Sequence, residues 1–309
     1  MIPLSLVTGF LGAGKTTLLQ RIARARGGRR CLFLVNEFAP GDVDGRKLAE
    51  VEAGGAGRVE SIVGGSVFCV CKVGDFAEAL GRAAEAWADA DPPLDGVIVE
   101  ASGIADPRVV GRMLAETELD ERFELRRIIT VVDPGTFGKL LRTLPNIRAQ
   151  VEAADLVLLN KTDLYDEPTI ESTIAAVREV RPEATIVPTS HCGAVVDPFE
   201  PVEVARADGD YAYCADPNYY ALDVPVEAAF DRDALSRCID AHADSLYRLK
   251  GNVRLGEGTP ARLELAAGGL TVEPLDHAPA AFHVTLIGPG SAKQTIDHLA
   301  AALREGRTP

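Results

Sequence analysis

Short apolar runs alternate with amphipathic stretches through the first two thirds of the chain. Runs rich in valine, leucine and isoleucine favour buried strands, whereas apolar side chains at helical spacing favour helices. The strands that we expect cover residues 2–8, 31–35, 96–99, 127–132, 155–159 and 185–187. This alternation predicts an α/β fold, with a mostly parallel sheet that carries helices on both faces. Ligands of such sheets bind at the carboxyl ends of the strands.

The pattern changes after Gly193. Proline, glycine and acidic residues then dominate with little periodicity, which is typical of a linker. We predict a first domain over residues 1–195, a linker over 196–210 and a smaller α+β domain over 211–309. The elements expected in this last part are strands near residues 221–226, 262–265 and 282–287 and helices near 233–243 and 293–303.

Composition narrows the range of partners. A net charge of −14 argues against nucleic acid or an anionic membrane as the main partner, because both would repel the average surface. Six cysteines in 309 residues, with only Cys69 and Cys71 close together, suit a reducing compartment rather than a disulfide framework. Residues 1–14 lack the basic start of a signal peptide, and no later uncharged run is long enough to span a bilayer. We expect a cytoplasmic protein.

A phosphate-binding loop follows the first expected strand, with the spacing Gly-x-x-x-x-Gly-Lys-Thr. Its glycines allow positive φ, so that successive N–H groups converge on phosphate oxygens. Lys15 brings a positive charge to the β and γ phosphates, and the Thr16 hydroxyl can bind Mg²⁺. Helical spacing after the loop favours this interpretation over a flexible glycine turn. The nucleotide-binding residues that we expect here are Gly9, Gly12, Ala13, Gly14, Lys15, Thr16 and Thr17.

The string Asn160-Lys161-Thr162-Asp163 follows a later expected strand. Asp163 can accept hydrogen bonds from N1–H and the exocyclic amine of guanine, whereas adenine offers no matching pair of donors. Alone the string would also suit a helix N-cap. Downstream of a phosphate loop in the same sheet, it predicts that Asn160, Lys161 and Asp163 bind GTP rather than ATP.

Glu100 ends the expected strand 96–99, where a second ligand of Mg²⁺ is expected. We therefore place Glu100 with Lys15 as the candidate catalytic residues. Ser102 and Gly103 are candidates for one nucleotide-sensitive switch. Asp42 and Asp44, in a long polar segment over residues 39–65 that we expect to be irregular, are candidates for the other.

Cys69 and Cys71 would project from the same side of an extended backbone. Two thiolates suit a metal of the zinc or cobalt class, with further ligands from elsewhere, and Lys72 would lower the thiol pKa. Two small buried hydrophobic side chains are the alternative.

These motifs together resemble the CobW-type P-loop GTPases, a group that includes UreG and HypB. The resemblance implies GTP binding, slow hydrolysis, a metal-responsive switch and a C-terminal domain that faces a client. It is carried by residues 9–17, 35–38 through Asp44, 99–107, 131–133 and 150–163, and by 249–251 with 286–288.

One departure from that family concerns its usual Cys-x-Cys-Cys string. Here Lys72 stands in place of the third thiol. We hypothesise that Glu37, or a thiol pair from a second protomer in a homodimer, completes the coordination.

The sequence thus predicts a cytoplasmic, slowly hydrolysing GTPase that uses Mg²⁺ and couples its nucleotide state to metal delivery to a client protein. An alternative is a regulatory module, in which GTP controls affinity for a metalloenzyme or corrinoid protein and the cysteines are structural. A third hypothesis, a small-molecule kinase, requires an adenine preference that residues 160–163 argue against.

Overall fold

The computed structural model describes residues 1–25, 30–37, 58–63, 68–69, 72–87, 91, 93–202, 208–211, 218–266, 269–279 and 281–306. The chain divides into two compact units. Described residues up to 211 belong to the first unit and those from 218 onward to the second. Each unit is described by itself below.

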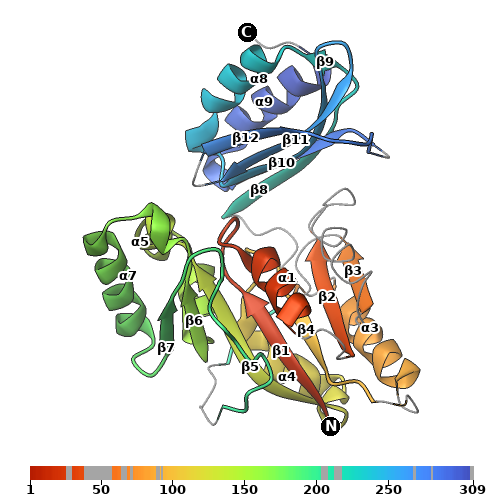
Figure 1. The fold of residues 1–309 in the computed structure, drawn as a ribbon, viewed down its shortest axis with the longest axis vertical. Helices are drawn as coiled ribbons and strands as arrows, with labels where there is room; N and C mark the ends of the chain where they lie inside the picture. The colour runs from red at the N-terminus through yellow and green to blue at the C-terminus, as the bar shows by residue number, and fades with distance from the viewer. Residues whose placement is uncertain are drawn as a thin grey trace. The chain divides into compact units, whose positions relative to one another are not determined.

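The described part of the first unit contains a seven-stranded sheet in the order β3-β2-β4-β1-β5-β6-β7 (Figure 1). Every pair of neighbouring strands is parallel. The α/β prediction for this part of the chain is therefore confirmed. The strands are β1 (Ile2–Thr8), β2 (Cys31–Glu37), β3 (Arg58–Val63), β4 (Gly96–Glu100), β5 (Phe123–Val132), β6 (Leu156–Leu159) and β7 (Thr185–Pro188).

Helices cover both faces of this sheet because successive strand residues point to opposite sides. Leu4 and Leu6 of β1 belong to a core with α3 and α4, whereas Val7 joins the core of α1 on the other face (Figure 1). The helices are α1 (Lys15–Ala25), α3 (Val73–Ala86), α4 (Val110–Glu116), α5 (Pro134–Thr143), α6 (Pro145–Glu152) and α7 (Glu167–Val180), with 3-10 turns η1 (Pro107–Val109), η2 (Leu119–Glu121) and η3 (Thr162–Leu164).

Residues 193–202, here called the strap, run across the α1 face of the sheet. Ser5 of β1 donates to the carbonyl of Pro198 (2.5 Å), and Arg127 of β5 donates to the carbonyl of Asp197 (3.0 Å). Phe199 lies so close to Gly96 that a Cβ there would overlap its ring. Much of the segment that we expected to be a linker is therefore anchored to the first unit, because Phe199 and these hydrogen bonds hold it there.

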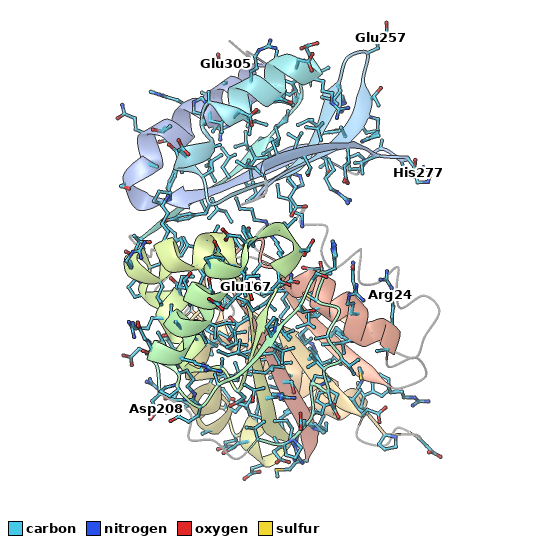
Figure 2. All side chains as sticks on the ribbon, turned by 60° about the vertical axis from the view of Figure 1, so that its left-hand side comes forward. Arg24, Glu167, Asp208, Glu257, His277 and Glu305 are labelled. Carbon is cyan, nitrogen blue, oxygen red and sulfur yellow. The ribbon has the colours of Figure 1, made fainter. Side chains whose placement is uncertain are left out.

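The second unit is an α+β sandwich of one sheet and two longer helices, as predicted for the C-terminal part. Its described strands have the order β12-β11-β10-β13-β8, antiparallel throughout, and β9 pairs in parallel with β10. Figure 2 shows Glu257 at the tip of the β10–β11 hairpin and Glu305 at the end of α9. The elements are β8 (Tyr219–Pro225), β9 (Ala229–Phe230), α8 (Arg232–Asp240), η4 (Ala243–Ser245), β10 (Arg248–Leu255), β11 (Thr259–Ala266), β12 (Gly269–Pro274), β13 (His283–Pro289), η5 (Gly290–Ala292) and α9 (Lys293–Glu305).

The core of the second unit lies between the sheet and both helices. Leu249, Leu263 and Leu286 lie on neighbouring strands and are buried together with Leu235 of α8 and Leu299 of α9. In neither unit do the described residues include a helix with the length and apolar composition that crossing a bilayer requires.

Candidate functional site

The loop between β1 and α1 needs glycine at specific positions. Gly9, Gly12 and Gly14 have φ values of 133°, 75° and 116°, which L side chains rarely adopt. A Cβ at Gly9 would overlap the carbonyl oxygen of Val131, and one at Gly14 would overlap the amide nitrogen of Asn160. The loop backbone therefore lies against both β5 and the end of β6.

Lys15 is the first residue of α1 and is only 8% exposed. Its ammonium donates to the carbonyls of Gly9 (2.8 Å) and Phe10 (3.2 Å), so its charge is held beside the loop. The first turn of α1 contains no acidic residue. The helix N-terminus and Lys15 together give the loop a positive potential suited to phosphate.

Thr16 and Glu100 face each other from α1 and β4. The Thr16 Oγ1 lies 3.3 Å from Oε1 and 3.4 Å from Oε2 of Glu100. These two residues come together because β1 and β4 are neighbours, with Val7 opposite Glu100. A hydroxyl and a carboxylate are oxygen ligands of the kind that Mg²⁺ prefers, so the residues present fit this ion.

The segment after β4 is held against the phosphate loop by a buried amide. Gln150 of α6, 2% exposed, donates to the carbonyls of Gly103 (3.0 Å) and Ala105 (3.3 Å). A Cβ on Gly103 would overlap Leu11 of the loop. The backbone N–H of Ser102 donates to the side chain of Asn36 (3.2 Å). The expected switch residues Ser102 and Gly103 therefore contact α6, the phosphate loop and β2.

Sequence reasoning gave no role to Asn36 or Gln150. A signal for Gln150 was present, because it shares the buried face of α6 with Ile147 and Val151. A polar residue among apolar neighbours at helical spacing indicates a buried hydrogen bond, without naming its partner.

Asn160 joins the phosphate loop to the loop after β7. Its amide nitrogen donates to the carbonyl of Ala13 (2.9 Å), and its amide oxygen accepts from the N–H of Cys192 (2.8 Å). Asp163 stands two fifths exposed nearby, open to a ligand. Asn160 thus positions the two loops, and Asp163, which we expected to bind the base, lies with its Oδ2 3.8 Å from the Nε2 of His191.

Lys161 points to a different partner, because its ammonium donates to Asp133 at the end of β5 (2.8 Å). Asp133 is 5% exposed and also accepts from the N–H of Gly135, which starts α5. Burial and a hydrogen bond to Asp133 raise the pKa of Tyr165 to about 12. The sequence gave Asp133 no role in the site.

Residues 189–192 follow β7 and are here called the base loop, because His191 lies beside Asp163, the carboxylate that we expect to bind the base. His191 and Cys192 both have positive φ (49° and 51°). Contacts from other elements hold this conformation, since Arg21 of α1 donates to the carbonyl of His191 (2.5 Å) and Thr162 donates to that of Thr189 (3.1 Å). Cys192 is fully buried, and burial raises the pKa of its thiol to about 12. The thiol is therefore protonated at neutral pH and unreactive.

The expected metal ligands are only partly described. Cys69 is 3% exposed and disulfide-bonded, so metal binding through its sulfur requires the reduced thiol. Lys72 pairs with Asp75 (2.9 Å). Cys71, the side chain of Glu37 and the switch candidates Asp42 and Asp44 lie outside the described residues. Within the described ranges no group of three or more His, Cys, Asp or Glu side chains is placed to hold a metal ion.

The parallel sheet carries a phosphate loop at the end of β1, with a hydroxyl and a carboxylate beside it. This combination defines a P-loop nucleotide-binding protein. The family model described as "CobW/HypB/UreG, nucleotide-binding domain" matches residues 3–188. The chain belongs to this family, and the resemblance noted from the sequence is confirmed.

Curated relatives extend beyond this domain. The zinc chaperone CobW of Pseudomonas aeruginosa is 27% identical over 306 residues, covering 85% of this chain and 79% of the relative. The zinc-regulated GTPase metalloprotein activator 1 of Schizosaccharomyces pombe is 31% identical over 194 residues, covering 62% of this chain and 46% of the relative. The crystal structure of Zn(II)-bound YjiA GTPase from Escherichia coli is 21% identical, covers 98% of this chain and 99% of that chain, and has a TM-score of 0.47.

Proposed function

We propose that this protein is a Mg²⁺-dependent GTPase of the cytoplasm that couples its nucleotide state to the delivery of zinc to a client metalloprotein. The observation that carries the GTPase assignment is the convergence of Lys15, Thr16 and Glu100 at one edge of the sheet that also carries Asn160 and Asp163. The family and the names of the relatives support the same assignment.

Each residue has a distinct role in this proposal. The loop N–H groups and Lys15 bind the β and γ phosphates, and Asp163 accepts the two donors of guanine. Thr16 and Glu100 would hold Mg²⁺, which supplies charge neutralisation at the phosphates when bound. Glu100 is buried beside Thr16, which keeps its carboxylate at the proposed metal position. We expect turnover to stay slow until a metal or a client protein orders the switch segments.

Zinc is proposed as cargo because relatives from Pseudomonas aeruginosa and Escherichia coli are named zinc chaperones. Cys69, Cys71 and Glu37 are the ligands that we assign to it, with a second protomer as the alternative source of the missing thiol. Zinc favours such thiolate and carboxylate ligands. The same names favour zinc over cobalt.

Base specificity tests the nucleotide site. Asp163→Asn replaces two acceptors by one acceptor and one donor, which matches xanthine better than guanine. We expect the Kd for GDP to rise about 100-fold and binding of xanthosine diphosphate to appear. Asp208→Asn, an exposed change outside the site, serves as the control. Unchanged GDP affinity in Asp163→Asn, or a preference for ADP, would refute the assignment of guanine to this site.

Cobalt(II) titration of the reduced protein, followed by thiolate absorption, tests the cargo. We expect a band that requires both Cys69 and Cys71, disappears in each serine variant and changes in affinity between GDP and a GTP analogue. Cys238→Ser in the second unit is the matched control, because this free cysteine is also buried.

A second candidate function is the regulatory module without cargo. The burial and disulfide bond of Cys69 favour it, because both are typical of a structural cysteine. It predicts that the wild-type protein shows no thiolate band with cobalt(II) in its GTP-bound form, and that Cys69→Ser lowers the melting temperature.

A further inference from the structure

Charge is unevenly distributed along this acidic chain. Residues 1–36 contain no aspartate or glutamate, although the net charge of the whole chain is −14. Five arginines fall within the ten residues 21–30. Three of these arginines, Arg21, Arg24 and Arg30, belong to the described residues. Positive side chains on an acidic protein create a local potential opposite to the average one.

A groove lies beside Arg21 and Arg24, between α1 and the start of the strap. Its volume is about 370 Å³. The buried side chains of Leu18 and Ile22 contribute apolar surface, and Val195 stands fully exposed at its rim. Arg21 and Arg24 are exposed, and Arg24 projects into solvent (Figure 2). The residues that line the groove are Leu18, Arg21, Ile22, Arg24, Ala25, Gly193, Ala194, Val195 and Val196.

The groove is physically continuous with the base loop. Its strap wall begins at Gly193, directly after Cys192, whose N–H is bound by Asn160. From the helix wall, Arg21 donates to the carbonyl of His191 (2.5 Å). A ligand carboxylate that pairs with Arg21 therefore competes with a contact that holds the base loop.

We propose that this groove binds an acidic segment of a partner protein and that binding there alters nucleotide affinity. Carboxylates of the segment pair with Arg21 and Arg24, and an aliphatic side chain packs on Val195 and the apolar floor. The effect on the nucleotide rests on the GTP site proposed above, whereas the docking itself does not.

The lining favours a protein segment over a nucleic acid. Among the described residues that line the groove, none is aromatic and none is acidic. Single-stranded nucleic acids are held by stacking on aromatic side chains as well as by positive charge. Aliphatic surface beside arginines instead suits a peptide that carries both leucine and glutamate.

Binding of a short fluorescent peptide that alternates glutamate and leucine tests the docking, by anisotropy on the full chain without nucleotide. Arg24→Glu and Val195→Asp each alter an exposed side chain and should weaken binding about fivefold or more. Arg178→Glu on α7 makes the same charge change at another exposed helix position and should leave binding unchanged. Melting temperatures should match the wild type.

Three results would overturn the docking: no saturable binding, equal loss in Arg178→Glu, or displacement of the peptide by a uridine oligonucleotide at equal charge concentration. Concentration-dependent dimerisation that is abolished by Val195→Asp, with no peptide binding, would assign the groove to a second copy of the chain and would also overturn it.

Release of fluorescent GDP, with and without the peptide, tests the coupling. We expect release to accelerate about threefold or more with the peptide, and this acceleration to vanish in Arg24→Glu. Unchanged release while the peptide is bound refutes the coupling alone. If GDP does not bind at all, the proposed function fails, and the peptide titration still decides the docking.

Discussion

Lys161 and Asp133 form an ion pair between the ends of β6 and β5, with Nζ 2.8 Å from Oδ2. The side chain of Asp133 is 5% exposed and that of Lys161 is 22% exposed, so the pair is only partly screened by solvent. Lys161 itself has a positive φ of 60°. The pair thus holds Lys161, in the middle of residues 160–163, in a conformation that a lysine rarely adopts.

Asp133→Asn should remove the charge of this pair and keep the N-cap of α5, because asparagine is also a good cap. We expect a loss of about 1 to 3 kcal/mol in the free energy of unfolding, below the value for fully buried pairs since Lys161 is partly exposed. GDP binding should weaken as well. Urea denaturation measures the free energy of unfolding, and calorimetric titration measures GDP binding. Asp208→Asn is the control for the loss of one negative charge. Equal stability of the two variants would show that the pair contributes nothing.

Gly14→Ala should abolish nucleotide binding, because φ is 116° and the added Cβ would overlap the Asn160 amide. Gly81→Ala is a matched control within α3, where a Cβ meets nothing within 4 Å. That control should raise stability by about 0.5 to 1 kcal/mol, because alanine is the better helix former. Calorimetric titration with GDP distinguishes the two variants, because only Gly81→Ala should bind it. GDP binding by Gly14→Ala would contradict the close approach of Gly14 to Asn160.

Gln150→Leu should leave the carbonyls of Gly103 and Ala105 without their shared donor. Unsatisfied buried groups of this kind cost about 1 to 3 kcal/mol. Because Ser102 and Gly103 in this segment are our candidates for a nucleotide-sensitive switch, we expect kcat for GTP hydrolysis to fall more than GDP affinity. Gln294→Leu, exposed on α9, is the control. A loss of GDP affinity equal to the loss of kcat would show that Gln150 only stabilises the fold.

Alkaline pH should destabilise the first unit through Cys192. The folded pKa of about 12 lies above the unfolded value of about 8.5, so the folded state keeps its proton longer. The resulting stability is complete below about pH 8.5 and is lost as pH rises toward 12, by up to about 1.4 kcal/mol per pH unit. Urea denaturation between about pH 8 and pH 11 should therefore show a shallower decline in Cys192→Ala than in the wild type. If stability falls equally steeply with pH in the wild type and in Cys192→Ala, Cys192 does not have this role. Cys238, whose pKa is also raised by burial, contributes the same pH dependence to both proteins.

The strand-forming runs and the motifs at their ends could be predicted from sequence because both signals are local. The first apolar run and the phosphate loop coincide with β1 and the start of α1. The strand β3 was missed, because residues 58–63 lie in a polar segment that we expected to be irregular. This strand lies at the edge of the sheet, where a strand needs fewer apolar residues.

The contacts that organise the site could not be predicted in the same way. Arg21 and His191 are 170 positions apart, and Asn160 and Ala13 are 147 apart. No local pattern encodes such pairs, because they depend on which strands become neighbours. Residues 196–202 of the strap were assigned to a linker for a related reason, since their composition gave no sign that Phe199 packs against Gly96.

The carboxamide of Asn160 holds the phosphate loop and the base loop together, through Ala13 of the one and Cys192 of the other. In the proposed GTP site these two loops are the phosphate half and the base half. The entropy needed to bring these halves into register is lost during folding and is not lost again on binding. A nucleotide anchored at one half then meets the other at high effective concentration. In the GTP site proposed above, guanosine alone or a free polyphosphate alone gains none of this chelate advantage.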